Sequence, residues 1–115
     1  MSQLRDKTHG CEWDKEQTFE SIAPFTIEEA YEVADAIVRE DNDDLKEELC
    51  DLLLQVVFLS QIASEEKLFA FIDVVEVITQ KLIRRHPYVF SDKRNHSSKE
   101  QIVQWEIIKK EERKQ

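Results

Sequence analysis

The 115-residue chain contains a single glycine, Gly10, and only two prolines. A Walker loop and a dinucleotide-binding fingerprint each need several glycines, so the chain contains neither. Hairpins of β-strands also depend on glycine- and proline-rich turns, and their scarcity leaves few places where strands could reverse direction. The composition therefore predicts a protein that is nearly all helix.

Cysteines and long apolar runs are also scarce. The two cysteines, Cys11 and Cys50, are too few for a disulfide framework and suit a reducing cytoplasm. No segment approaches 18 consecutive apolar residues, and the first seven residues lack the apolar stretch of a signal peptide. We therefore expect a cytoplasmic protein that has no membrane partner.

Positive charge is in short supply, because 25 Asp and Glu residues outnumber 16 Lys and Arg residues and give a formal net charge of −9. Binding to a nucleic-acid polymer begins with a basic surface that neutralises phosphates. The charge balance therefore argues against DNA or RNA as a partner. A chain of this length corresponds to one domain, so we expect a single domain over residues 1–115.

The spacing of apolar residues predicts a bundle of four to five helices joined by short connections. After an irregular lead over 1–14, the first four helices are expected over about 15–22, 25–39, 44–66 and 72–85. A polar loop over 91–98 and a capping box at 97–100 then precede a last helix that ends near residue 112. The first helix should stop before Pro24, because the residue ahead of a proline disfavours the helical conformation. Asp43 or Asp44 is expected to cap the third helix.

Two of these helices carry acidic residues at positions i and i+3, which places each pair on one side of its helix. The acids are Glu28, Glu29 and Glu32 on one helix and Glu48 and Asp51 on the next. In an antiparallel hairpin, the residue numbers of facing residues add up to the same value for every pair. Glu29 with Asp51 and Glu32 with Glu48 have the same sum, which centres the turn near Glu40. The four carboxylates can therefore converge, as they do in bundles that bind metals.

Each set of acids also has a structural explanation. On the earlier helix a solvated polar face accounts for them, and a capping box with Thr26 accounts for Glu29. On the later helix Glu48, Asp51 and Gln55 form a narrow strip flanked by apolar side chains, so these acids are predicted to face inward. Buried acids are costly unless they are compensated, either by lysine or arginine or by a metal. An all-oxygen ligand set favours Mg²⁺ or Mn²⁺.

A basic cluster follows near the end of the fourth predicted helix. Lys81, Arg84 and Arg85 share one face by their i, i+3 and i+4 spacing. Arginine matches the geometry of phosphate, so this face can bind the phosphates of a substrate. The same residues can equally complement the dipole at the carboxyl end of the helix.

The acidic pattern resembles that of the MazG family of all-α nucleoside triphosphate pyrophosphohydrolases. The family pattern of Glu-Glu-x-x-Glu, a spacer and Glu-x-x-Asp appears here as Glu28-Glu29-x-x-Glu32, fifteen intervening residues and Glu48-x-x-Asp51. The similarity covers almost the whole chain and is closest to the amino-terminal domain of MazG proteins. Its other matching segments are residues 10–14, 47–53 and 84–90, together with Trp105 and Lys109.

The resemblance implies a MazG-like bundle that hydrolyses nucleoside triphosphates between the α- and β-phosphates and releases pyrophosphate. It implies that Mg²⁺, with Mn²⁺ as a possible substitute, is bound by Glu29, Glu32, Glu48 and Asp51, and that Glu28 is a supporting acid. The general base is unassigned among these carboxylates. We therefore expect the five acids to form the catalytic centre.

The resemblance also implies substrate-binding residues and an assembly. Lys81 and Arg85 match positions expected to contact phosphates, and Arg84 is a third candidate. Trp105 matches a tryptophan near the nucleotide, and Trp13 can stack on a base, although packing explains either tryptophan as well. Family members assemble through helix pairing, so a homodimer or a dimer of dimers is expected.

Three departures from the family pattern leave other functions open. Glu12 stands where relatives often have proline, and Cys50 stands where they commonly have glycine. The chain also lacks the preceding helix and the second domain of many relatives, so we expect a stand-alone member or an excised domain. The alternatives are a catalytically weak or inactive domain that binds nucleotide or dimerises, and a purely structural helical domain.

Overall fold

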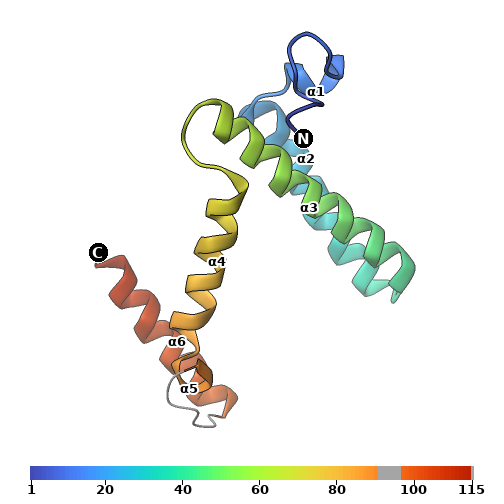
Figure 1. The fold of residues 1–115 in the computed structure, drawn as a ribbon. Helices are drawn as coiled ribbons and strands as arrows, with labels where there is room; N and C mark the ends of the chain where they lie inside the picture. Colours follow the sequence, from blue (N-terminus) through green and yellow to red (C-terminus); the bar gives the residue numbers. More distant parts are fainter. Residues whose placement is uncertain (91–96, 115) are drawn as a thin grey trace. The chain divides into compact units, whose positions relative to one another are not determined.

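The computed structural model describes residues 1–90 and 97–114, which form helices and connecting turns without any strand (Figure 1). The predicted all-α fold class is therefore confirmed. The helices are α1 (Glu12–Glu16), α2 (Phe19–Val38), α3 (Asn42–Glu65), α4 (Phe71–Arg85), α5 (Pro87–Phe90) and α6 (Ser98–Arg113). The chain divides into two compact units, Met1–Val74 and Val75–Gln115. The single domain expected over 1–115 stays a prediction.

Helix α2 is one continuous helix that passes through Pro24, so the predicted break before this proline is wrong. The helix begins earlier because Thr18 caps it. The Thr18 hydroxyl accepts a hydrogen bond from the backbone N–H of Ser21 (3.1 Å), and the Ser21 hydroxyl accepts one from the N–H of Thr18 (2.7 Å). Pro24 lies in the second helical turn, where the missing N–H costs one intrahelical hydrogen bond. The reciprocal cap offsets that loss.

A tight turn joins α2 to α3 and reverses the chain at the predicted position. Glu40 adopts a left-handed backbone conformation with φ of 57°. The predicted cap at Asp43 or Asp44 is wrong, because Asp41 caps α3 and accepts a hydrogen bond from the N–H of Asp44 (3.0 Å). Helices α2 and α3 therefore pack together as an antiparallel hairpin, which is the central element of the first unit.

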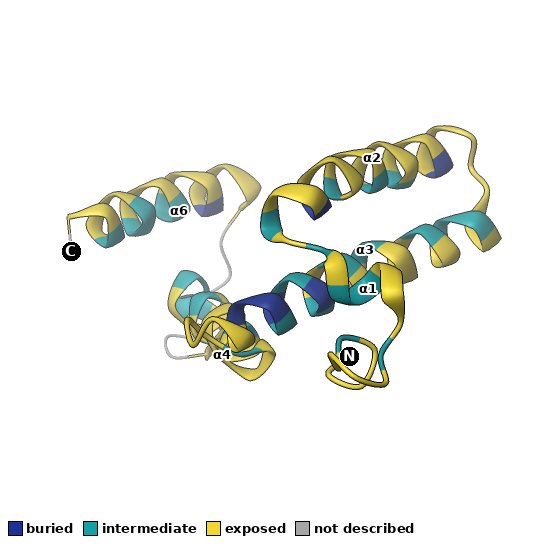
Figure 2. Cartoon of the chain, turned by 90° about the horizontal axis from the view of Figure 1, so that it is seen from above, coloured by how far each residue is buried: buried dark blue, intermediate teal, exposed yellow. Residues whose placement is uncertain are grey.

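The core of the first unit lies between the start of α2 and the second half of α3 (Figure 2). Ile22, Phe58 and Ile62 form its buried cluster, against which Met1 and Phe19 pack. The buried cluster therefore closes one end of the hairpin. The acidic residues of the hairpin lie between this core and the turn at Glu40, where fewer side chains are buried.

The second unit contains the end of α4 together with α5 and α6. The Trp105 indole N–H donates to the carbonyl of Arg85 (2.9 Å), and the His86 ring contacts the Trp105 ring edge-on at 5.5 Å between centroids. Ser97 caps α6 as predicted by accepting from the N–H of Glu100 (3.2 Å). Most of the polar loop predicted over 91–98 lies outside the described residues. Within the described parts of the chain, no helix has the length and hydropathy needed to cross a membrane.

Candidate functional site

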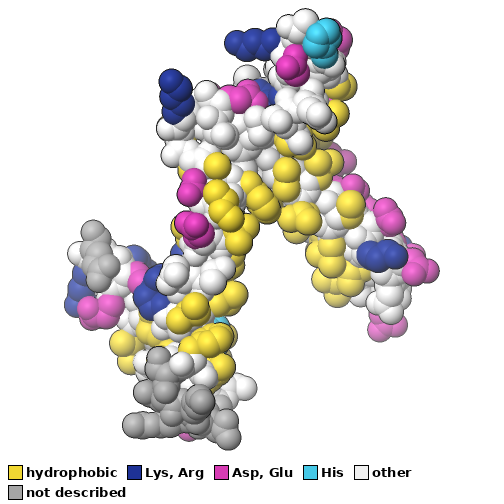
Figure 3. Space-filling view, viewed as in Figure 1, with side chains coloured by type: hydrophobic (Ala, Val, Ile, Leu, Met, Phe, Trp, Pro, Cys, Tyr) yellow, Lys and Arg dark blue, Asp and Glu magenta, His cyan; other side chains and the backbone are white. Residues whose placement is uncertain are grey.

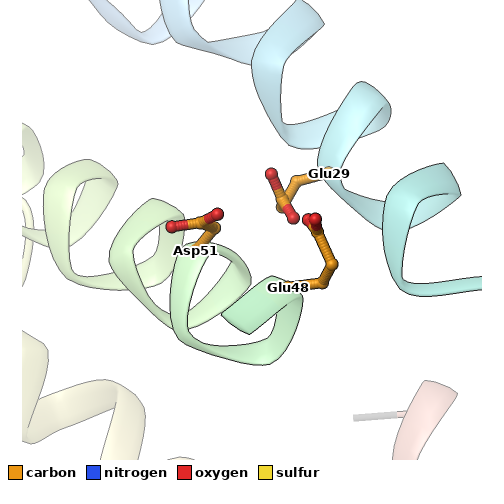
Figure 4. Close-up of side chains that lie close together, drawn as sticks. All are labelled: Glu29, Glu48 and Asp51. Atoms are coloured by element: carbon orange, nitrogen blue, oxygen red, sulfur yellow. The ribbon is translucent and has the colours of Figure 1, made fainter. Parts of the chain in front are cut away.

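Three of the predicted acids meet across the α2–α3 hairpin. Glu29 extends from the middle of α2, whereas Glu48 and Asp51 extend from neighbouring turns of α3 (Figure 4). One carboxylate oxygen of each residue lies within 4.8 Å of the others. The hairpin brings them together because the i, i+3 spacing of the α3 pair presents both acids to α2.

The other two predicted acids lie outside this group. Glu28 and Glu32 are both exposed on α2, and the group of converging carboxylates among the described residues includes neither. The capping-box explanation for Glu29 is wrong, because α2 begins at Phe19 and Thr26 lies inside the helix. The Thr26 hydroxyl instead lies within hydrogen-bond distance of the Gln55 amide oxygen, to which it donates over 3.3 Å.

Among the described residues, the converging carboxylates have no basic partner. No ion pair found among residues 1–90 and 97–114 involves Glu29, Glu48 or Asp51. The Oε1 atom of Glu29 is buried and has no hydrogen-bond partner in the described structure. A buried polar atom without a partner is rare in folded proteins. No basic side chain in the described structure therefore compensates this negative charge.

The acidic group also changes the protonation of one of its members. A proton shared with Glu29, partial burial, and the negative charges of Glu29, Asp44 and Asp51 together raise the pKa of Glu48 to about 7. Desolvation and nearby like charges both favour the neutral form of a carboxyl group. At neutral pH a proton and a cation therefore compete for these carboxylates.

The donor set fits a hard divalent cation. It consists entirely of carboxylate oxygens, which are the ligands that Mg²⁺ and Mn²⁺ prefer. Glu29 and Glu48 are half-buried while Asp51 is exposed, so one side of the group is open to solvent. A few carboxylates with open positions are typical of sites where Mg²⁺ also contacts water or substrate phosphates. The uncompensated Glu29 oxygen and the oxygen-only donors both agree with such an ion.

An apolar pocket of about 280 Å³ lies beside the acidic group in the first unit. Its walls include Trp13, Phe25 and Phe58, with Trp13 in edge contact with Phe25 at 5.8 Å and with Phe58 at 6.3 Å between ring centroids. Gln55 also lines the pocket. It follows Asp51 by one turn of α3, which is about 6 Å along the helix. The pocket and the carboxylates therefore adjoin along the same side of α3.

The predicted basic cluster lies in the second unit, where its arginines already have an acidic partner. The Arg84 Nε donates to Glu112 (2.6 Å), and the Arg85 Nη2 donates to the other oxygen of the same carboxylate (3.1 Å). These arginines lower the pKa of Glu112 to about 2. Lys81 is half-buried and has no ion-pair partner among the described residues. The structure therefore pairs two of the three predicted phosphate-binding residues with Glu112.

Both tryptophans have packing partners. Trp105 uses its indole N–H to hold the Arg85 carbonyl, whereas Trp13 contacts two other aromatic rings and leaves half of its surface exposed. A polar pocket of about 500 Å³ next to Arg85 belongs to the second unit. Its other lining residues are Glu106, Lys109, Glu112 and Arg113. Trp105 therefore positions the main chain of Arg85, whereas Trp13 remains partly accessible to a ligand.

Two residues that the sequence reasoning did not select contribute to these sites. Glu112 fixes Arg84 and Arg85 from a helix that begins after residue 97, and Arg5 contacts the back of the aromatic pocket. Neither residue belongs to a local motif. Their roles depend on contacts between distant segments, which spacing along the sequence does not reveal.

Comparisons with known proteins agree with this architecture. The protein family described as "MazG nucleotide pyrophosphohydrolase domain" matches residues 17–90 of the chain. This interval includes the five predicted acids and the basic cluster but neither tryptophan. The crystal structure of a MazG-related protein from Thermotoga maritima matches with a TM-score of 0.72 over 87% of both chains, at 24% identity, which shows the shared fold.

Two curated relatives match almost the whole chain. The nucleoside triphosphate pyrophosphohydrolase of Escherichia coli K12 is 58% identical over 115 residues, which are all of this chain and 44% of that protein. The nucleoside triphosphate pyrophosphohydrolase/pyrophosphatase MazG of Thermotoga maritima is 50% identical over 113 residues, which are 98% of this chain and 42% of that protein. The chain thus spans less than half the length of these relatives.

Proposed function

The chain belongs to the MazG nucleotide pyrophosphohydrolase family, and on that premise we propose that it hydrolyses nucleoside triphosphates to the monophosphate and pyrophosphate. The observation that carries the proposal is the group of three carboxylates, for which the described part of the chain provides no basic partner. A structural domain would gain nothing from placing like charges together, because each repels the others and loses hydration. A hydrolase that uses a divalent ion needs such a group.

The proposed metal ligands are Glu29, Glu48 and Asp51, with Glu32 as a fourth ligand from the next turn of α2. Glu28 stays a supporting acid, and the general base is one of these carboxylates. When bound, Mg²⁺ supplies positive charge for the phosphate oxygens and a more acidic water. Glu29 and Glu48 would hold the ion at the hairpin, because their half-buried side chains have little freedom to move.

The nucleoside end of the substrate would enter the aromatic pocket. Trp13 is half exposed and would stack on a base, and Phe25 and Phe58 would exclude water from the walls. Gln55 can donate a hydrogen bond from its amide nitrogen, because its oxygen already accepts one from Thr26. The pocket and the carboxylates adjoin along α3, so one extended ligand could contact both.

Lys81, Arg84 and Arg85 stay the proposed phosphate contacts. Lys81 carries an uncommitted ammonium group, and Arg85 keeps a buried Nε–H without a partner in the described structure. Arg84 and Arg85 are held by Glu112, so phosphate would share them with this carboxylate or replace it. Trp105 would act through Arg85, whose carbonyl it binds.

We also propose that the chain assembles as a homodimer or a dimer of dimers in the cytoplasm. Large apolar side chains on α3 are exposed, and Figure 3 shows hydrophobic side chains gathered over the hairpin. The residues are Leu49, Leu53, Leu54 and Val56. Contiguous apolar surface of this kind is typical of protein interfaces. Cys11 and Cys50 are free thiols, in agreement with a reducing compartment.

Pyrophosphate release tests the proposal. The purified chain, incubated with a panel of NTPs and dNTPs, should release pyrophosphate with Mg²⁺ and none with EDTA. Asp51→Asn should lower the rate at least 100-fold, because it removes a ligand charge, whereas the exposed neighbour Glu47→Gln should retain it. Release of orthophosphate, or no turnover with any substrate, would reject the proposal. Nucleotide binding without turnover would instead identify an inactive nucleotide-binding domain.

A further inference from the structure

Arg5 has a nearly inaccessible side chain, although it lies in the irregular segment ahead of α1. Its side chain is 8% exposed, whereas its partner Glu65 is 38% exposed. Buried arginine is rare unless several groups compensate its charge. The surroundings of Arg5 therefore indicate a specific role for the guanidinium group.

The guanidinium group of Arg5 contacts two separate parts of the first unit. It binds Glu65 on α3 through two parallel hydrogen bonds, from Nε (2.7 Å) and from Nη2 (2.8 Å). Its Nη1 donates to the backbone carbonyls of Asp14 (2.6 Å) and Gln17 (3.1 Å) at the end of α1. Its carbon centre also lies 5.5 Å from the centre of the Phe58 ring. Arg5 therefore ties α1 to α3.

These contacts meet directly behind the aromatic pocket. Phe58 is both a wall of the pocket and the ring that Arg5 covers. Asp14 also lines the pocket, and the carbonyl that Arg5 holds belongs to the residue next to Trp13. The five-residue helix α1 has no buried residue and is too short to be stable alone. The position of Trp13 therefore depends on the anchor that Arg5 provides.

The segment that carries Arg5 is itself tightly folded. The N–H of Cys11 donates to the Leu4 carbonyl and that of Gly10 to the Asp6 carbonyl, both over 2.8 Å. A Cβ atom at Gly10 would lie 2.4 Å from each of these two carbonyl oxygens, so only glycine fits. The loop thus fixes the main chain on both sides of Arg5 before any ligand binds.

We propose that Arg5 is a positioning residue for the nucleoside pocket, which it keeps open and complete by holding the Trp13 wall against Phe58. The inference rests on the proposed function, since it assumes that a nucleoside occupies this pocket. Arg5 itself contacts neither the nucleotide nor the carboxylates. Losing it should therefore weaken nucleotide binding and leave the chemical step at the hairpin nearly unchanged.

The test compares steady-state kinetics of Arg5 variants with a matched control. Arg5→Gln should raise KM at least 10-fold and change kcat less than 2-fold, and Arg5→Lys should give an intermediate KM because one ammonium group cannot reach all three acceptors. Arg39→Gln is the control, since Arg39 forms ion pairs with Asp35, Asp41 and Asp44 at the α2–α3 turn, away from the pocket. Its KM should match the wild type.

An unchanged KM in Arg5→Gln, or a loss confined to kcat, would overturn the inference. If Arg5→Gln does not fold, Glu65→Gln replaces it, because this change weakens the anchor but keeps the carbonyl contacts. It should raise KM about 3-fold, and a wild-type KM would overturn the inference.

Two measurements distinguish a wrong proposed function from a wrong role for Arg5. A wild-type chain that releases no pyrophosphate contradicts the hydrolase. In that case the wild type and Arg5→Gln are compared by their affinity for a non-hydrolysable triphosphate analogue. Binding is measured from the fluorescence of Trp13, with a Trp13→Phe variant as the blank. Arg5→Gln must bind the analogue at least 10-fold more weakly, and equal binding by both proteins overturns the role of Arg5.

Discussion

Glu29 and Asp51 lie opposite one another across the α2–α3 hairpin, and one carboxylate oxygen of each lies within 4.8 Å of the other and of Glu48. Like charges at this distance repel each other. The buried Oε1 atom of Glu29 adds the cost of an unmade hydrogen bond. A bound divalent cation would therefore stabilise the hairpin.

Magnesium should stabilise the fold through this group. At a concentration roughly 100-fold above its Kd, Mg²⁺ should raise the free energy of unfolding by about 2.7 kcal/mol. Thermal unfolding at constant ionic strength measures the effect as a rise in Tm. Asp51→Asn should abolish the rise, whereas the exposed Glu47→Gln should keep it. An equal rise in Asp51→Asn would show that Mg²⁺ acts elsewhere.

Glu48→Gln should make the metal-free protein more stable. The substitution removes one of three mutually repelling charges and retains the size of the side chain. In EDTA at pH 8 the Tm of the variant should exceed the wild-type Tm by a few degrees, and added Mg²⁺ should no longer raise it. A lower Tm in EDTA would mean that Glu48 has a stabilising partner and that the repulsion argument fails.

Gly10→Ala should disturb both stability and nucleotide binding. The new Cβ would lie 2.4 Å from two backbone carbonyl oxygens, so the loop must shift. Overpacking of this kind costs about 1–3 kcal/mol, which urea unfolding can measure. KM should rise as well, because the shift moves Arg5. The exposed Thr8→Ala in the same loop is the control, and a wild-type KM for Gly10→Ala would separate the loop from the pocket.

Glu112→Gln should reduce the sensitivity of the protein to acid. Arg84 and Arg85 lower the pKa of Glu112 from 4.5 to about 2. A lowered pKa contributes stability that is complete above pH 4.5 and is lost as the pH falls towards 2. The wild type should therefore lose more free energy of unfolding than the variant between pH 6 and pH 3.

Urea unfolding at the two pH values gives the comparison for Glu112. The exposed pair of Glu111 with Lys114 provides the control, because Glu111→Gln should leave the pH dependence unchanged. If Glu112→Gln and the wild type lose the same free energy of unfolding on acidification, the two arginines do not hold Glu112 as the structure indicates.

The hairpin and its acids were predictable because local patterns determine them. The apolar period defines α2 and α3, and the polar run around Glu40 supplies the turn, so the facing of Glu29 and Asp51 follows from counting residues. Pro24 misled the prediction because a proline in the second turn removes only one intrahelical hydrogen bond, and the reciprocal cap formed by Thr18 and Ser21 begins the helix ahead of it. Local propensity is a weak guide where a cap competes with it.

The remaining contacts could not be predicted because they join segments far apart in the sequence. Arg5 binds Glu65 sixty residues away, and Glu112 binds Arg84 twenty-eight residues away. No spacing rule relates such pairs, since the path of the chain between them decides whether they meet. The roles of Arg5 and Glu112 therefore became apparent only from the structure.

A titration with Mn²⁺, in which electron paramagnetic resonance measures the bound ion, tests most directly whether the hairpin carboxylates hold a divalent ion. We expect saturable Mn²⁺ binding that Mg²⁺ competes away, that Asp51→Asn abolishes and that Glu47→Gln retains. Binding that is equal in all three proteins, or that never saturates, would contradict it.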